Sequence, residues 1–252
     1  MNLLFVYLVN VALLARLPLL LPDDPVCGRR ALAGTAVQLA ALLALAPTRG
    51  VVFTALAIAA VNGLAWRWEQ RRSARGLMAG RLVALAVTAL GFAALCSPFL
   101  DLRFRPDLGL LADCVGVYFV PVAWLKAIPW SAFHACLLGA LLCLNEANLV
   151  VRLLIETFDL RPVDAKTQPQ HAPLGGREYN RGRIVGLLER LIVFFLVLEG
   201  EYGALGLVMA TKGLARFKNL DDREFAEYFL IGTMLSIVLA GGIALIVKHA
   251  VQ

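Results

Sequence analysis

Long apolar stretches separated by short polar segments make up most of the chain. The apolar stretches cover residues 2–22, 31–46, 50–66, 78–100, 107–127, 131–157, 184–199, 203–217 and 225–248. A helix that crosses the hydrocarbon core of a bilayer needs about 20 mostly apolar residues, and continuous runs of this kind favour helices over the alternating strands of a membrane barrel. The pattern therefore predicts an all-α polytopic integral membrane protein with about eight transmembrane helices.

One long polar stretch, residues 158–183, contains three prolines and the adjacent Gly175 and Gly176. Prolines and glycines at this density are typical of a linker. We therefore expect an N-terminal helical membrane part, residues 1–157, and a C-terminal helical membrane part, residues 184–252, joined by a polar cytoplasmic linker.

Arginines and lysines gather in three polar segments, residues 67–77, 158–183 and 212–224. Basic loops tend to stay on the cytoplasmic side of a membrane. If all three segments are cytoplasmic, the chain must cross the bilayer an even number of times between residues 77 and 158. Three apolar stretches lie in this interval, so one of them does not cross. Segment 107–127, which carries charges and a proline, is therefore the best candidate for a re-entrant or interfacial segment.

The composition also favours a membrane protein. Hydrophobic residues make up 60% and charged residues 17% of the chain, and the mean hydropathy is +0.75. The net charge of +6 is explained by basic cytoplasmic loops, which offer contacts to anionic lipid, rather than by a nucleic-acid partner. The five cysteines and three histidines are scattered, without the spacing of a disulfide framework or a zinc site. We expect no metal and no cofactor.

Polar residues at membrane depth are costly, so their positions carry information about function. In the sixth apolar stretch, Asn145, Asn148, Arg152 and Glu156 fall on one helical face, with His134 on the same stripe a few turns earlier. Two interpretations stay open. The face is either a polar track that lines a cavity or an interhelical hydrogen-bond seam with Arg152 reaching toward the interface.

A second group of charges lies in the C-terminal part and consists of Glu189, Arg190, Lys212 and Glu227. An ionised carboxylate among apolar neighbours is strongly destabilised unless it has a partner of opposite charge. We therefore predict at least one direct contact between a glutamate and a basic residue within this group.

Small residues recur at spacings that let two helices approach closely. Gly182 and Gly186 stand four residues apart, and Gly232 and Ser236 repeat this spacing in the last apolar stretch. We predict helix–helix contacts at these four positions.

Three ordered runs in residues 182–236 resemble a known family. The runs are GRIVGLLER, GALGLVMATKGLARF and EYFLIGTMLS, and they resemble the C-terminal membrane region of an uncharacterised bacterial membrane-protein family (domain of unknown function 3307). The N-terminal half is not matched. The resemblance implies a bacterial cytoplasmic-membrane setting but no activity. The matching positions are Gly182, Arg183, Gly186, Glu189, Arg190, Lys212, Arg216, Phe217, Glu227, Tyr228, Gly232, Thr233 and Ser236.

No motif for nucleophilic, metal-dependent or nucleotide-dependent catalysis occurs in the chain. The leading hypothesis is therefore a transporter or channel component for a small solute or ion in the bacterial inner membrane, with buried charges along its route. The alternative is a non-catalytic scaffold or subunit that binds a second copy or another membrane protein. A membrane-embedded enzyme that modifies lipids is the third hypothesis.

Overall fold

The computed structural model describes residues 2–19, 27–70, 74–96, 102–105, 129–158, 175–215 and 223–251. The regular structure in these residues is helical, apart from one isolated β-bridge between Leu45 and Phe104. Segment 107–127, the expected re-entrant or interfacial segment, lies outside them, as does most of the polar stretch 158–183.

The chain divides into two compact units. Unit 1 comprises residues 1–138 with residue 251, and unit 2 comprises residues 139–250 with residue 252. The division falls within helix α6 (Trp130–Leu144), ahead of the polar stretch that the sequence pattern suggested as the linker. Each unit is described by itself below.

Within the described residues, four helical segments are long and apolar enough to cross a membrane: Arg49–Glu69, Gly76–Leu95, Trp130–Thr157 and Ala226–Val251. The sequence predicted about eight. Three other helices, α1 (Leu3–Ala15), α2 (Gly28–Ala41) and α10 (Tyr202–Ala215), have only 13, 14 and 14 residues. At 1.5 Å per residue each is about 20 Å long, short of the roughly 30 Å hydrocarbon core.

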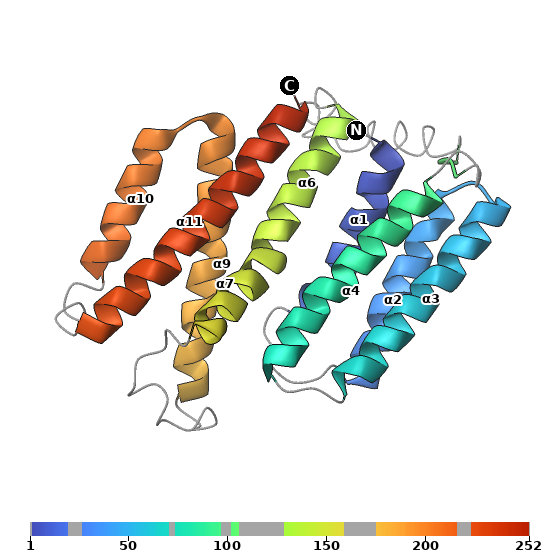
Figure 1. Ribbon diagram of the computed structural model, residues 1–252. Helices are drawn as coiled ribbons and strands as arrows, with labels where there is room; N and C mark the ends of the chain where they lie inside the picture. The colour runs from blue at the N-terminus through green and yellow to red at the C-terminus, as the bar shows by residue number, and fades with distance from the viewer. Residues whose placement is uncertain are drawn as a thin grey trace. The chain divides into compact units, whose positions relative to one another are not determined.

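Unit 1 contains a four-helix bundle. Its helices are α1, α2, α3 (Arg49–Glu69) and α4 (Ala74–Leu95). They alternate in direction (Figure 1), and contacts join α1 to α2, α2 to α3, α3 to α4 and α4 back to α1. The bundle is therefore closed, with one face of each helix turned to a common interior. Buried apolar residues fill part of this interior, among them Val6, Leu8, Leu13, Ile58 and Phe92.

The first helix is shorter than its apolar stretch suggests. Residues 2–22 were expected to form one helix, but α1 ends at Ala15 and only a 3-10 turn, Leu17–Leu19, follows within the described residues. Arg16 closes α1 as its C-cap, and Pro18 lacks the backbone N–H that a continuing helix needs. The third helix, by contrast, continues through Trp66 and Arg67 to Glu69, three residues beyond the expected end.

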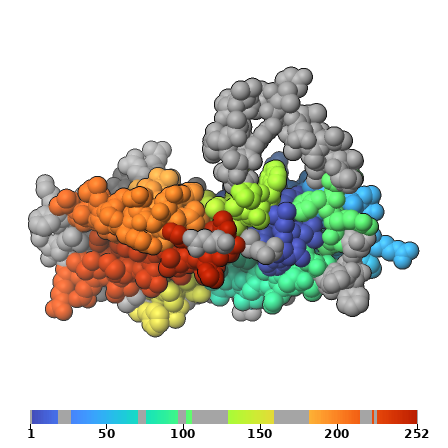
Figure 2. Space-filling model, turned by 90° about the horizontal axis from the view of Figure 1, so that it is seen from above, coloured from blue at the N-terminus to red at the C-terminus, as the bar shows by residue number. Residues whose placement is uncertain are grey.

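The described residues of unit 2 form the end of α6 and four further helices. These are α7 (Glu146–Thr157), α9 (Gly175–Glu199), α10 and α11 (Arg223–Val251). The stretch 131–157 was expected to be one helix, but a turn at Asn145 interrupts it. Helix α9 begins at Gly175, so residues 175–183 of the expected linker are helical. Helices α10 and α11 lie side by side, orange and red in Figures 1 and 2.

The turn between α9 and α10 depends on Gly200, whose φ of 85° is a conformation that favours glycine. The Gly200 N–H bonds to the Val197 carbonyl at 3.2 Å, and the Glu201 N–H bonds to the Leu196 carbonyl at 2.8 Å. This pair of bonds is a Schellman motif, which satisfies the last carbonyls of a helix. The end that the sequence assigned to the stretch 184–199 is thus confirmed at Glu199.

The predicted small-residue contacts are present only in part. A Cβ at Gly232 would lie 3.9 Å from Ile155 of α7, and Ser236 is buried. No described atom lies within 4 Å of the Cβ position of Gly182, and only the side chain of Arg190, on the same helix, comes within 4 Å of that of Gly186. The described residues thus give no support for helix contacts at Gly182 and Gly186, and these two contacts stay a prediction.

The close helix approach in unit 2 is instead at Gly139, which the sequence analysis did not single out. Replacing Gly139 by alanine is expected to destabilise the protein by about 1–3 kcal/mol, the range for overpacking a core. A Cβ there would overlap the ring of Phe194 and approach Val247, and the ring cannot move aside because Phe194 is fully buried.

Gly242→Ala is the matched control, because no described atom lies within 4 Å of its Cβ position. This replacement should be neutral or stabilising, since alanine favours a helix over glycine. Thermal unfolding in detergent measures both variants. Equal effects at the two positions would contradict the close approach at Gly139.

Candidate functional site

Three polar side chains of α2 and α3 meet inside the bundle of unit 1. Asn62 donates from Nδ2 to Gln38 Oε1 at 2.8 Å and to Thr35 Oγ1 at 3.1 Å. Thr35 donates in turn to the carbonyl of Ala31 on its own helix. Because these groups satisfy one another, the bundle can bury them at low cost. We call Thr35, Gln38 and Asn62 the amide cluster.

The amide cluster keeps hydrogen-bonding capacity for a ligand. Gln38 is only 6% exposed, and it accepts the hydrogen bond from Asn62 through Oε1. Its Nε2 group has no partner within the described residues. Because Gln38 lines the pocket, this amide can donate to a ligand or a water molecule there.

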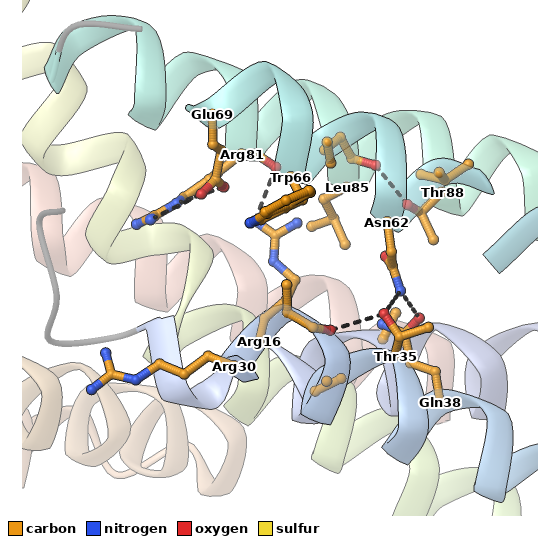
Figure 3. A pocket seen from close by; sticks show the side chains of 17 residues that line it. Arg16, Arg30, Thr35, Gln38, Asn62, Trp66, Glu69, Arg81, Leu85 and Thr88 are labelled. Carbon is orange, nitrogen blue, oxygen red and sulfur yellow. Dashed lines mark hydrogen bonds and ion pairs between the residues drawn. The ribbon is translucent and has the colours of Figure 1, made fainter. Parts of the chain in front are cut away.

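A buried ion pair lies toward the end of the bundle where α3 finishes. Arg81 of α4 contacts Glu69 of α3 through Nε and Oε1 at 3.1 Å and through Nη2 and Oε2 at 3.5 Å. Arg16, directly after α1, donates from Nη2 to the backbone carbonyl of Arg81 at 2.9 Å. The Trp66 ring lies beside the Arg16 guanidinium (Figure 3). These contacts tie α1, α3 and α4 together.

The amide cluster and the arginines line one pocket of about 100 Å³ between α1, α2, α3 and α4 (Figure 3). Drug-sized ligands occupy pockets of about 300–1,000 Å³. This pocket therefore suits a small solute, a single ionic group of a larger molecule, or a few water molecules. Its lining residues are Ala12, Ala15, Arg16, Arg30, Ala31, Gly34, Thr35, Gln38, Val61, Asn62, Ala65, Trp66, Glu69, Arg81, Ala84, Leu85 and Thr88.

The charged groups of the lining are three arginines and one glutamate, a formal net charge of +2. Glu69 is engaged by Arg81. Arg30 is exposed and extends away from the amide cluster in Figure 3, so it marks the open side of the pocket. No hydrogen bond or ion pair joins the Arg30 side chain to another described residue. The pocket thus carries a net positive charge, although apolar residues make up much of its lining.

Acid–base chemistry has little support in this pocket. Its carboxylate, Glu69, is held in an ion pair, and a general acid or base must be able to exchange a proton with a bound substrate. Among the described residues, no three histidine, cysteine, aspartate or glutamate side chains gather as metal ligands would.

The structure places the sequence-predicted residues of unit 2 around the interruption at Asn145. Arg190 of α9 donates from Nε to the carbonyl of Cys143 at 3.0 Å and from Nη2 to Asn148 Oδ1 at 3.1 Å. Cys143 lies in the last turn of α6, where carbonyls lack an intrahelical partner and attract a cation. Arg190 therefore satisfies the end of α6 and joins the two groups of polar residues that the sequence analysis treated separately.

The predicted contact between a glutamate and a basic residue is confirmed. Lys212 Nζ of α10 lies 2.5 Å from Glu189 Oε2 of α9, and its ammonium is 5.2 Å from the centre of the Phe229 ring. Glu227 instead pairs with Arg223 on its own exposed helical turn. The four charges thus do not share one centre.

The expected polar stripe of the sixth stretch is not continuous. His134 belongs to unit 1, where its carbonyl accepts from Asn10 Nδ2 at 2.9 Å. Asn145 and Asn148 are buried near the helix interruption in unit 2, next to a buried Glu146 that the sequence analysis passed over. Arg152 and Glu156 lie further along α7 and are partly exposed. None of these residues lines the pocket of unit 1.

Sequence reasoning missed the pocket, although two of its residues carried a usable signal. Gln38 and Asn62 are the amide side chains of two apolar stretches, 31–46 and 50–66, and an amide at membrane depth needs a partner. Glu69 and Arg81 gave no comparable signal, because charges near the ends of apolar stretches are ordinary.

Comparison of the chain with protein-family models, with curated proteins and with solved structures finds no match. The resemblance of residues 182–236 to a bacterial family stays a prediction, and support for a function comes from the site itself.

Proposed function

We propose that the chain is a multi-pass protein of the bacterial inner membrane that takes a small polar solute into the pocket of unit 1, as a transporter or channel component. The observation that carries the proposal is the set of arginines and amide side chains that line a pocket inside a bundle of apolar helices. Charged side chains within a membrane protein are costly, and they often mark a substrate or ion route.

The alternative, a scaffold or subunit, is favoured by a different observation. Gly203, Gly206 and Gly213 of α10 have no described atom within 4 Å of their Cβ positions. Such a small-residue side can receive a helix of a second copy or of another membrane protein. A lipid-modifying enzyme is disfavoured, because the carboxylate of the pocket is held in an ion pair.

Gln38→Leu is expected to reduce solute passage at least fivefold while the protein still folds. The variant removes an amide donor that faces the pocket, and losing one hydrogen bond to a solute weakens binding by about 1 kcal/mol or more. The measurement is flux of small sugars, amino acids, sulfate and phosphate into proteoliposomes, compared with protein-free vesicles.

Thr54→Val is the control. Thr54 is a fully buried polar residue of the same bundle, but its hydroxyl bonds to the Gly50 carbonyl of its own helix and does not line the pocket. This variant should retain the flux of the parent protein. If no solute class passes faster than through protein-free vesicles, the transport proposal fails and the subunit alternative takes its place.

A further inference from the structure

We propose that the pocket of unit 1 binds a phosphate group, with Arg30 as the residue that recognises it. The inference rests on the proposed function, because it names the ligand class for the same site. Three arginines against one glutamate leave a formal charge of +2 around a small cavity. A phosphate monoester carries about −1.5 to −2 at pH 7 and therefore balances this charge, whereas a carboxylate balances half of it.

The donors of the pocket match the acceptor oxygens of a phosphate. Arginine guanidinium groups bind phosphate through two parallel N–H bonds, and they do so better than lysine. Arg30 has no hydrogen-bond or ion-pair partner among the described residues, so a ligand does not have to displace one. Further inside, Gln38 offers an N–H donor that no described acceptor uses. Donors thus stand at the open side and at the interior of the same cavity.

The start of α2 adds to the positive potential. The helix begins at Gly28, its N-cap Cys27 makes no side-chain cap, and its first turn contains no acidic residue. The first N–H groups of a helix carry a partial positive charge, and anions bind there readily. Arg30 and Ala31 of this turn line the pocket. This feature supports the inference and does not stand alone, since the cavity and the arginines point to the same ligand.

The cavity size limits what the site can hold. About 100 Å³ accommodates a phosphate group but not a nucleotide or a sugar phosphate with all its atoms. The phosphate is therefore either the free ion or the headgroup of an anionic lipid whose remaining atoms stay outside. Both sources present the same chemistry to Arg30, and the experiment below separates them.

The test compares Arg30→Gln with Arg29→Gln in the full chain. The two arginines are neighbours on α2, both are exposed, and only Arg30 lines the pocket. Each variant removes one positive charge from the same turn, so a difference between them cannot arise from net charge. No hydrogen bond or ion pair joins either side chain to another described residue, so both variants should fold like the parent protein.

Two arms use different probes. In the first, inorganic phosphate is titrated into protein in uncharged detergent by isothermal calorimetry. In the second, retention of phosphatidate against phosphatidylcholine is measured by native mass spectrometry. We expect saturable binding in one arm, which identifies the source. Arg30→Gln should weaken that binding about tenfold or more, and Arg29→Gln should change it less than twofold, since a charge-assisted hydrogen bond accounts for a tenfold effect.

Two outcomes would overturn the inference. One is saturable binding in neither arm. The other is equal weakening by both variants, which would indicate diffuse attraction to a basic surface. Solute flux that depends on Gln38 can persist in either case, so this inference can fail while the proposed function stands. Conversely, phosphate binding without any solute flux would support the phosphate site and contradict the proposed transport function.

Discussion

A leucine in place of Arg190 is expected to lower the stability of the protein by about 3 kcal/mol or more. Arg190 is 4% exposed and donates to the Cys143 carbonyl and to Asn148 Oδ1. Without the guanidinium, both acceptors stay buried and unsatisfied, at about 1–3 kcal/mol each. The carbonyl cannot turn to an intrahelical donor, because α6 ends at Leu144. Thermal unfolding in detergent measures the loss.

Two further variants make the Arg190 result specific. Arg190→Lys keeps the positive charge but lacks the forked N–H donors of arginine. This variant should therefore lose less stability than Arg190→Leu. Arg223→Leu removes an arginine whose side chain is 92% exposed, and it should leave the unfolding temperature nearly unchanged. A leucine at position 190 that leaves stability unchanged would show that the interruption at Asn145 does not depend on this residue.

Glu69→Ala is expected to cost about 3–5 kcal/mol, because it leaves the buried Arg81 guanidinium without its carboxylate. The two side chains are only 9% and 5% exposed, and two contacts join them. A charge in such a position has lost its hydration, and the variant also removes the carboxylate that compensates it. Unfolding in detergent is again the measurement.

The double variant Glu69→Leu with Arg81→Met distinguishes loss of the pair from loss of packing. Replacing both members of a buried ion pair by apolar residues is often neutral, so the double variant should recover most of the stability. A double-mutant cycle then gives the coupling between the two residues. Additive losses would show that Glu69 and Arg81 act independently, contrary to the geometry.

These expectations assign different roles to the charges of the chain. Arg190 and the Glu69–Arg81 pair hold helices together, and their removal should lower stability. The Arg30 side chain makes no hydrogen bond or ion pair with another described residue. Its replacement should therefore alter ligand binding and leave stability unchanged. Measuring stability and binding on the same variants therefore separates the framework of the pocket from the groups that face a ligand.

The sequence by itself determined that the protein is helical and where most helices lie. The stretch 225–248 corresponds to α11, and 203–217 corresponds to α10 within a few residues. Long apolar runs are visible without knowledge of the fold, because their cost of exposure to water is a property of each residue. The helix lengths were less predictable: at α1 the apolar run continues past the helix end, and hydropathy does not distinguish a helix from an apolar turn.

The sequence also showed which charges need a partner, but not which partner. Glu189, Arg190 and Lys212 stand out because charges are rare in apolar stretches. Their sequence proximity suggested one centre, whereas Lys212 pairs with Glu189 and Arg190 turns to the end of α6. Helix rotation and the interruption at Asn145 decide this, and both follow from packing between distant segments.

Only the tertiary structure assembled the candidate site. Arg16, Gln38, Asn62 and Arg81 belong to four different segments of the chain, and no pattern within one segment shows that they meet. They meet because α1, α2, α3 and α4 close into a ring that turns one face of each helix inward. The direction in which a helix faces depends on the neighbours that it packs against. In an apolar environment the hydrophobic pattern of the helix itself carries little of that information.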